Sequence, residues 1–454
     1  MKTSLVSFLL VAALTGVASL SAKSSHQSGP VRLNVDIDRG VLPAGSTERA
    51  VVKIGLDCVK LPPRQERPPV NLALVIDRSG SMSGEKIAKA REAALELVRR
   101  LGPDDIISII AYDSRVETLV PAQRVGRARG LEQAICGIEA GGNTALYGGV
   151  VRGSEEVRRN LAVEDGRYVN RIILLSDGLA NVGPSSPEEL GRLGASLLRE
   201  GVSVTTVGLG LGFNEDLMTR FAQRSDGNTW FVESSADLPR IFAAELGDVL
   251  RVVARRVVIE IDFPEGVRPL NFVGRDGVIR GQRAELSLNQ LYGGQEKFAL
   301  VEVEVSPAKP GVEREIARAQ VRYEDAVNQR AMTATARRAV KFSADDRAVV
   351  ASADHQVQAD YAANAIAVAK DQAIALVDAG RRDEAGALLR QQADDLKKMG
   401  DMFSNSAVKE IAAANAPEAA RLEREGLSNE RRKSYRADSY QTMNQQSSAG
   451  SSKP

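Results

Sequence analysis

The chain has 454 residues, of which 43% are hydrophobic, 26% charged and 4% aromatic, a composition typical of folded domains rather than of fibrous or disordered chains. The 60 Lys and Arg residues balance 59 Asp and Glu residues, and the net charge of +1 argues against general binding to nucleic acid. With only two histidines, His26 and His355, and two cysteines, Cys58 and Cys136, neither a His/Cys zinc cluster nor a Ser-His-Asp triad can be assembled convincingly. The length predicts two to four domains.

Residues 1–22 have the layout of a secretory signal peptide. Lys2 precedes the apolar run Leu5–Leu20, and small residues follow it. A membrane anchor is the alternative, but the run is short and Ser7, Thr15 and Gly16 interrupt it, which favours cleavage. We therefore expect an exported protein that is periplasmic, secreted or peripherally associated with the cell envelope. Nothing after residue 22 reaches the length of a transmembrane helix, so we expect no membrane span in the mature chain. Export permits a disulfide between Cys58 and Cys136, but a single pair in so long a chain favours two buried free thiols.

Residues 31–66 form a strand-rich segment, in which residues 31–59 alternate apolar and polar side chains around a turn at residues 42–45 and a proline-rich connector begins at residue 61. This pattern predicts two strands of a half-buried antiparallel sheet. Strand-like alternation returns at residues 255–325, beyond the next domain. Because the two strand-rich segments flank one domain, we predict a single β-sandwich built from both, with that domain inserted in it.

Residues 70–252 alternate apolar strands with amphipathic helices. The apolar run Asn71–Ile76 is followed by apolar residues at helical spacing from Ile87 to Leu101. Four further strands are expected at residues 106–112, 171–175, 202–207 and 229–232, with helices at 131–138, 146–159, 187–199, 215–224 and 236–252. Repeated β-α units predict an α/β fold, with a doubly wound, mostly parallel, Rossmann-like sheet covered by helices on both faces.

The C-terminal part is predicted to be helical over residues 345–425. Two apolar stripes at helical spacing meet at residues 378–385, which resemble the junction of a tetratricopeptide-like helix pair. Residues 428–454 are polar and rich in Ser and Gln, so we expect a disordered tail.

Hydroxyl and carboxyl side chains follow the predicted strands of the α/β domain. Asp77, Ser79 and Ser81 form an Asp-x-Ser-x-Ser segment directly after the strand 71–76, Thr144 precedes a helix, and Asp177 follows the strand 171–175. Loops at the carboxyl ends of parallel strands meet in the crevice where such sheets bind ligands. Hard oxygen groups of this kind suit Mg²⁺ or Mn²⁺ and do not suit soft metals.

Together these five residues resemble the metal-ion-dependent adhesion site (MIDAS) of the von Willebrand factor type A (VWA) domain family. The resemblance covers residues 71–252, and the flanking strands and the segment 67–72 also resemble those of the inter-alpha-trypsin inhibitor heavy chain branch and its bacterial relatives. It implies that Ser79, Ser81 and Thr144 are direct ligands, that Asp77 and Asp177 act mainly through water, and that the ion is Mg²⁺, with Mn²⁺ or Ca²⁺ as alternatives.

Two other features near these loops have alternative interpretations. Asp113 follows the strand 106–112 and could approach the crevice, but a turn residue at the strand end is the preferred interpretation. The segment Ser83–Lys86 matches the Ser-x-x-Lys of penicillin-recognising enzymes, but the companion motifs are missing, so we interpret it as the start of a helix.

The sequence therefore predicts an exported adhesion or scaffolding protein that binds a protein ligand through a divalent cation. Three neutral direct ligands would leave the ion short of negative charge, so we expect the partner to supply an Asp or Glu carboxylate. The alternative is an envelope-associated processing enzyme in which the VWA domain only recruits substrate. No nucleophile–base pair is visible for it, so we predict that the chain is not an enzyme.

Overall fold

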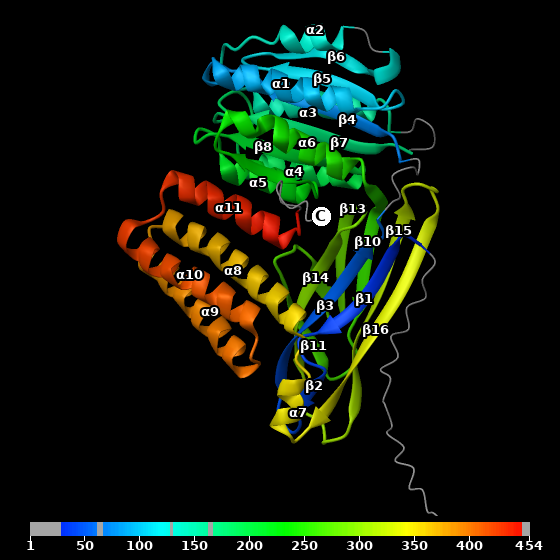
Figure 1. The fold of residues 1–454 in the computed structure, drawn as a ribbon, viewed down its shortest axis with the longest axis vertical. Helices are drawn as coiled ribbons and strands as arrows, with labels where there is room; N and C mark the ends of the chain where they lie inside the picture. The colour runs from blue at the N-terminus through cyan, green and yellow to red at the C-terminus, as the bar shows by residue number, and fades with distance from the viewer. Residues whose placement is uncertain (1–28, 61–66, 128–129, 162–166, 447–454) are drawn as a thin grey trace, which may run out of the picture.

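The computed structural model describes residues 29–60, 67–127, 130–161 and 167–446. An α/β body lies at one end, a β-sandwich lies beneath it, and a bundle of helices packs along one side of both (Figure 1). The segment interpreted as a signal peptide, residues 1–22, lies outside the described residues.

The α/β body is built on a six-stranded sheet in the order β6-β5-β4-β7-β8-β9, in which only β6 is antiparallel to its neighbour. Every residue of β4, β5, β7 and β8 is buried, as expected for parallel strands covered on both faces. The antiparallel edge strand β6 was not predicted. The strands are β4 (Val70–Asp77), β5 (Ile106–Tyr112), β6 (Val116–Arg124), β7 (Val169–Ser176), β8 (Val202–Leu209) and β9 (Thr229–Val232).

Helices cover both faces of this sheet, which confirms the doubly wound fold. Along β4, Leu72, Leu74 and Ile76 pack in one core with α1, α2 and α6, while Ala73 and Val75 pack in a second core with α3, α4 and α5. The helices are α1 (Glu85–Arg100), α2 (Leu131–Cys136), α3 (Leu146–Arg158), α4 (Pro187–Arg199), α5 (Glu215–Arg224) and α6 (Leu238–Val249). Short 3₁₀ turns occupy η1 (Gly80–Met82), η2 (Val125–Arg127) and η4 (Ser235–Asp237).

The β-sandwich combines strands from before and after the α/β body, as predicted. Its two sheets, β1-β3-β14-β11 and β12-β13-β10-β15-β16-β2, enclose one apolar core. Its strands are β1 (Val31–Ile37), β2 (Val41–Pro43), β3 (Glu48–Cys58), β10 (Val252–Asp262), β11 (Val267–Val273), β12 (Val278–Arg280), β13 (Arg283–Tyr292), β14 (Glu296–Val305), β15 (Glu313–Asp325) and β16 (Ala331–Ser343). Strand β16 lies beyond the predicted range 255–325 and pairs along the length of β15.

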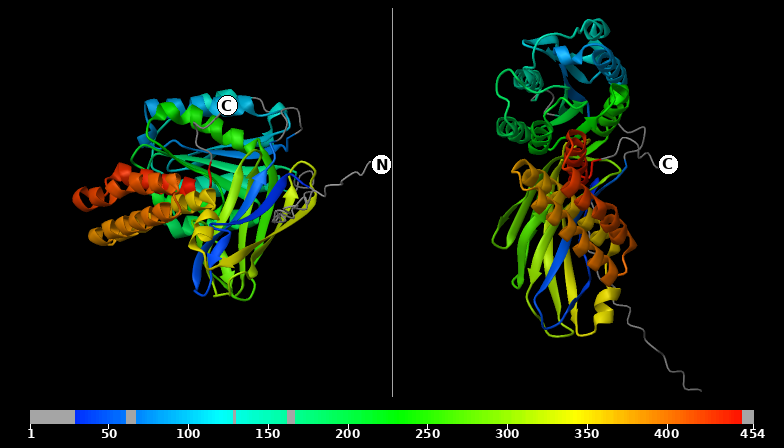
Figure 2. Two further views of the ribbon diagram at one scale, coloured as in Figure 1. Left: turned by 60° about the horizontal axis from the view of Figure 1, so that its bottom comes forward. Right: turned by 90° about the vertical axis from the view of Figure 1, so that its left-hand side faces the viewer.

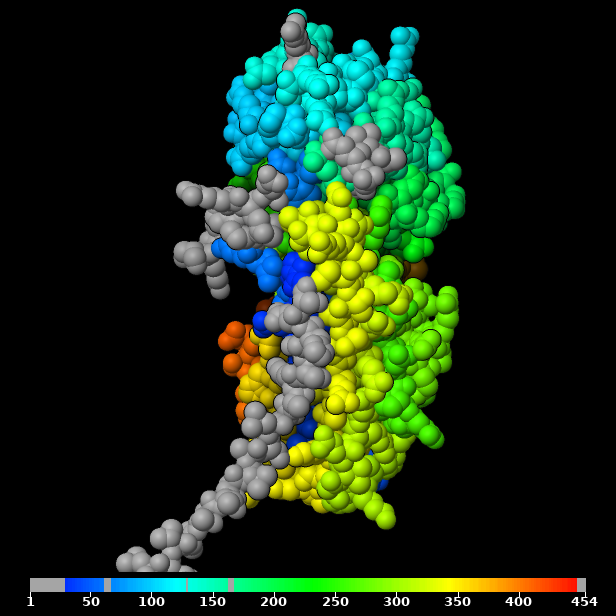
Figure 3. All heavy atoms as spheres, turned by 90° about the vertical axis from the view of Figure 1, so that its right-hand side faces the viewer, coloured from blue at the N-terminus to red at the C-terminus, as the bar shows by residue number. Residues whose placement is uncertain are grey.

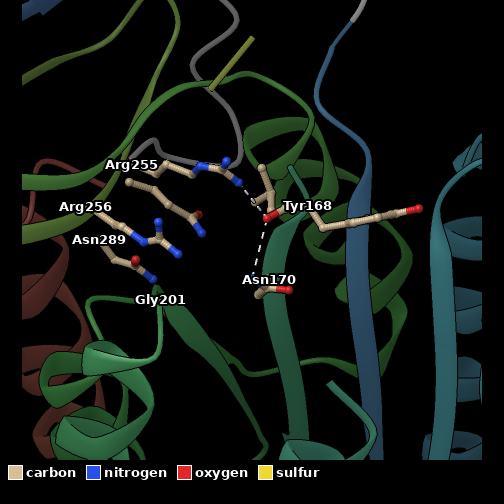
Figure 4. Close-up of a pocket in the computed structure, with 8 residues that line it drawn as sticks. Tyr168, Asn170, Gly201, Arg255, Arg256 and Asn289 are labelled. Carbon is tan, nitrogen blue, oxygen red and sulfur yellow. Dashed lines mark hydrogen bonds between the residues drawn. The ribbon is translucent and has the colours of Figure 1, made fainter. Parts of the chain in front are cut away.

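The α/β body is seated on one end of the sandwich, and β16 extends along the sandwich away from it (Figure 3). The side chain of Arg171, on β7, is fully buried and donates hydrogen bonds to Gln290 (2.8 Å) and Tyr292 (2.5 Å) of β13. Beside it, Arg255 of β10 donates to the Tyr168 carbonyl at 3.0 Å, at the edge of a narrow polar pocket between the two parts (Figure 4). The α/β body is therefore joined to the sandwich by buried polar contacts as well as by the chain.

The C-terminal helices are α7 (Asp346–Ala351), α8 (His355–Asp378), α9 (Arg382–Met402), α10 (Ser406–Glu425) and α11 (Asn429–Met443). Helices α8, α9 and α10 pack against one another around two small apolar clusters. Helix α11 runs between the bundle and the α/β body, as two directions of view show (Figure 2).

Two sequence predictions are wrong here. Residues 429–443 of the expected disordered tail form α11, because charged side chains of this helix pair with acids of the α/β body and of α8; residues 447–454 lie outside the described part of the chain. Both cysteines are free, but only Cys58 is buried. Cys136 is exposed because it ends the short helix α2, whose residues Leu131 and Ile135 occupy the buried side.

Candidate metal centre

Three loops meet at the carboxyl edge of the sheet and bring the five predicted residues together. Asp77 ends β4 and the loop after it carries Ser79 and Ser81, the loop before α3 carries Thr144, and the loop after β7 begins at Asp177. All of them except Ser81 are buried. Backbone hydrogen bonds tie the first two loops together, from the Gly80 amide to the Gly142 carbonyl (3.0 Å) and from the Gly141 amide to the Arg78 carbonyl (2.8 Å).

Asp77 is held on both oxygens at the end of β4. Oδ1 accepts a hydrogen bond from the Ser79 amide at 2.8 Å, and Oδ2 accepts one from Ser176 Oγ at 2.8 Å and one from the Tyr112 hydroxyl at 3.4 Å. Burial raises the pKa of Asp77 above its usual value, and the hydrogen bonds from Ser79 and Ser176 oppose that rise. The carboxylate is thus fixed in position under the loop.

The hydroxyls form a short chain that leads to the second carboxylate. Ser79 Oγ and Ser81 Oγ lie 3.0 Å apart, and Ser81 Oγ donates to Asp177 Oδ1 at 2.6 Å. The loop after β4 is therefore linked directly to the loop after β7, 96 residues later in the chain.

Thr144 faces the same space from the third loop. Its amide donates to Asn181 Oδ1 at 2.8 Å, and its carbonyl accepts from the Asn181 and Val182 amides. A Cβ placed on Gly178 would lie 3.3 Å from Ser81 Oγ and 3.5 Å from Thr144 Oγ1. The hydroxyls of Ser81 and Thr144, which belong to different loops, thus approach the position that a side chain at residue 178 would occupy. Glycine leaves this space open.

This donor set fits a small, hard dication. Ser79, Ser81 and Thr144 offer neutral oxygens and the two aspartates offer carboxylates, the ligand types that Mg²⁺ and Mn²⁺ prefer. Within the described ranges no three His, Cys, Asp or Glu side chains are grouped closely enough to hold a metal ion. A metal at these loops would therefore depend on the hydroxyls.

Arg78 and Asp113 form an ion pair at the rim. Arg78 contacts Asp113 at 2.9 Å and Glu117 at 3.0 Å, and Asp113 Oδ1 accepts from the Arg115 amide at 2.8 Å. Asp113 therefore acts as a turn residue that pairs with Arg78, as the preferred sequence interpretation held.

Sequence reasoning missed the part that Lys86 plays. Its Nζ lies 2.5 Å from Asp177 Oδ2, so the segment Ser83–Lys86 does more than begin a helix. The available signal was the position of Lys86 in the first turn of α1, from which side chains point back toward the preceding loop.

Residues 71–244 match the family model of the von Willebrand factor type A domain. The α/β body is therefore a VWA domain, inserted in the sandwich and followed by helices.

Among its relatives, an uncharacterized protein of Synechocystis is 28% identical over 295 residues, 63% of this chain and 68% of that protein. Human inter-alpha-trypsin inhibitor heavy chain H3 is 28% identical over 208 residues, which are 43% of this chain but only 22% of that protein. The match thus spans less than a quarter of the human relative.

Two solved structures share most of the fold. A von Willebrand factor type A protein from Catenulispora acidiphila has a TM-score of 0.64 at 19% identity, covering 88% of this chain and 97% of that one. The ArnB paralog VWA2 from Sulfolobus acidocaldarius has a TM-score of 0.60 at 17% identity, covering 92% and 98%. At these identities the likeness concerns the fold alone.

Proposed function

We propose that this protein binds a protein partner through a divalent cation held at the three loops of the VWA domain. Ser79, Ser81 and Thr144 act as direct ligands, and Asp77 and Asp177 act mainly through water. The observation that supports this most is the convergence of these oxygens, above all the 2.6 Å contact between Ser81 and Asp177, which belong to different loops. The activity is binding and involves no turnover.

The partner supplies an Asp or Glu carboxylate in this proposal. When bound, the cation would offer a coordination position to an anionic oxygen. The protein's own residues favour such a ligand because the three direct ligands are uncharged and Asp77 is already held by Ser79, Ser176 and Tyr112. Mg²⁺ is the proposed ion, with Mn²⁺ and Ca²⁺ as alternatives that a titration distinguishes.

Export to the periplasm, the medium or the cell envelope is part of the same proposal. It is supported by Lys2, the apolar run Leu5–Leu20 and the small residues after it. Across the described ranges, none of the helices is both long and apolar enough to cross a membrane.

Metal binding should raise the melting temperature of the full chain. A ligand present at 100 times its dissociation constant stabilises the folded state by about 2.7 kcal/mol. We expect Mg²⁺ or Mn²⁺ to raise the melting temperature of the wild type, and Asp77→Ala and Thr144→Ala to lose that response while remaining folded. Differential scanning calorimetry and circular dichroism measure both.

Ser83→Ala is the matched control, because this hydroxyl lies in the same loop but donates to the Gly80 carbonyl at 2.8 Å. It should keep the metal response, and equal responses in all three variants would refute the site. Proteins that the immobilised chain retains in Mg²⁺ and releases with chelator are candidate partners. Changing each acid of such a partner to its amide should identify one on which affinity depends; tight binding that persists without metal would contradict the carboxylate bridge.

A further inference from the structure

Lys86 brings a positive charge into the metal centre that the proposed ligands do not include. It is the second residue of α1, directly after the loop that carries Ser79 and Ser81. Its ammonium group contacts Asp177 Oδ2 at 2.5 Å. On the other side, a Cβ placed on Gly210, in the loop between β8 and α5, would lie 4.0 Å from Lys86 Nζ. The ammonium group of Lys86 therefore lies between Asp177 and the loop that contains Gly210.

The two oxygens of Asp177 face two different groups. Oδ1 accepts from Ser81, one of the proposed ligands, and Oδ2 accepts from Lys86. The side chain of Asp177 is 0% exposed and that of Lys86 is 36% exposed. A buried carboxylate is screened poorly by water, so a direct counter-charge offsets much of its negative charge.

Arg78, the other positively charged residue next to these loops, does not neutralise Asp77 or Asp177. Arg78 points to Asp113 and Glu117 at the rim, at 2.9 and 3.0 Å. The three ligand loops therefore hold the carboxylates of Asp77 and Asp177, with Lys86 as the ammonium group in contact with one of them.

We propose that Lys86 sets the affinity of the centre for divalent cations by neutralising Asp177. The inference rests on the proposed function, since it assumes that the loops hold such a cation. Even with the full screening of water, which is the weakest case, a unit charge ~6 Å from a dication changes affinity about tenfold. Lys86 therefore weakens metal binding and keeps the ion exchangeable. It also adds positive charge where an acidic partner docks.

Lys89 provides a matched control on the same helix. It lies one turn further along α1, its side chain is 31% exposed, and it pairs with Glu92 at 2.8 Å rather than with the metal centre. Removal of either lysine takes one positive charge from α1, but only the Lys86 variant removes it from Asp177.

The test is titration of the full chain with Mg²⁺ and with Mn²⁺ alone, by isothermal calorimetry. Lys86→Gln should bind each ion about tenfold more tightly than the wild type. Lys89→Gln should match the wild type, and Lys86→Arg, which keeps the charge, should stay close to it. Without metal, Lys86→Gln should melt at a lower temperature, because Asp177 loses its charged partner, and metal should raise that temperature by more than in the wild type.

Unchanged or weaker affinity in Lys86→Gln would overturn the inference, even if the melting temperature fell, because a purely structural lysine predicts that pattern. A wild type that binds neither ion would instead refute the proposed metal site, and this inference with it. If Lys86→Gln does not fold, Lys86→Met removes the same charge, and it should show the same gain in metal affinity.

Discussion

Gly178 shows how closely the candidate metal centre is packed around its oxygens. Its position one residue after Asp177 places it under Ser81 and Thr144, whose hydroxyls both lie within 3.5 Å of the point where a Cβ would stand. Its φ does not lie in the left-handed region, so alanine suits the backbone there. The lack of a side chain is therefore needed for space and not for conformation.

We predict that Gly178→Ala folds but binds metal more weakly. Overpacking costs about 1–3 kcal/mol, and contacts of 3.3 and 3.5 Å place this methyl group near the low end, equivalent to roughly a fivefold loss of affinity. Calorimetric titration with Mg²⁺ measures the change. Gly141→Ala is the control, because a Cβ on Gly141 meets nothing within 4 Å although it lies in a neighbouring loop. Equal affinities in the two variants would show that the space above Gly178 is not part of the metal centre.

At the residue scale, local spacing was enough to select the candidate ligands, but it could not define their contacts. Asp77, Ser79 and Ser81 stand at a fixed spacing after a buried strand, and this pattern is readable in the sequence. The pair between Lys86 and Asp177 joins residues 91 positions apart. Such a pair depends on how two strands lie in the sheet, and side-chain type alone does not reveal it.

At the scale of elements, α11 is held by ion pairs as well as by buried side chains. Lys433, whose side chain is 2% exposed, pairs with Glu215 and donates to the Phe213 carbonyl at 2.5 Å. Arg432 and Arg436 both contact Asp216, at 2.7 and 2.6 Å. These acids begin α5, where negative charge is also favoured by the helix dipole. The helix thus ties the C-terminal bundle to the α/β body.

We predict that Lys433→Met destabilises this contact. Removing the sole partner of a buried ion pair costs about 3–5 kcal/mol, and because Arg432 also contacts Glu215, we expect a loss below that range. Hydrogen exchange should accelerate in α11 and at the start of α5. Lys398→Met is the control: Lys398 is 74% exposed and pairs with Asp395 on α9, and such pairs contribute about 0.5 kcal/mol or less. If the two variants exchange alike, the buried pair does not hold α11 in place.

The same contacts explain why the sequence predicted most elements but not this one. The strands of the α/β body are continuous apolar runs, and α8 and α9 carry apolar stripes, so their patterns identify them. Helix α11 has the polar sequence NERRKSYRADSYQTM, and its partners in the α/β body lie more than 200 residues earlier. Strand β6 contains Pro121 and is only partly buried at the sheet edge, so its alternation is weak.

At the scale of the whole molecule, the end of α11 reaches the third part, the sandwich. Lys297 of β14 donates hydrogen bonds to the Asn444 carbonyl and to the Gln445 carbonyl, the latter at 3.3 Å. Arg275 donates to the Asn444 carbonyl at 2.9 Å. The other side of α11 contacts the α/β body, where the Tyr440 hydroxyl donates to the Gly227 carbonyl at 2.6 Å. Helix α11 and the two residues after it therefore join the C-terminal bundle to both the α/β body and the sandwich. The carbonyls of Asn444 and Gln445 accept hydrogen bonds from the buried side chains of Lys297 and Arg275.

Burial, together with the positive charge of Arg275, lowers the pKa of Lys297 from 10.5 to about 7. Between these two values the unfolded chain keeps a proton on Lys297 that the folded protein releases. The free energy of unfolding therefore rises with pH between pH 7 and pH 10.5. The stability gained in this way is lost again as the pH falls toward 7. From pH 7 to pH 9 we expect the wild type to gain about 2 kcal/mol more than Lys297→Met, which has no proton to release.

Urea unfolding at pH 7, 8 and 9 measures this difference, and comparison of variants cancels the groups that titrate in both. Lys341→Met, at an exposed position of β16, should keep the pH dependence of the wild type. If Lys297→Met shows the same rise with pH as the wild type, Lys297 keeps its proton in the folded protein. It would then hold the end of α11 as a charged donor, and its replacement should destabilise the molecule equally at all three pH values.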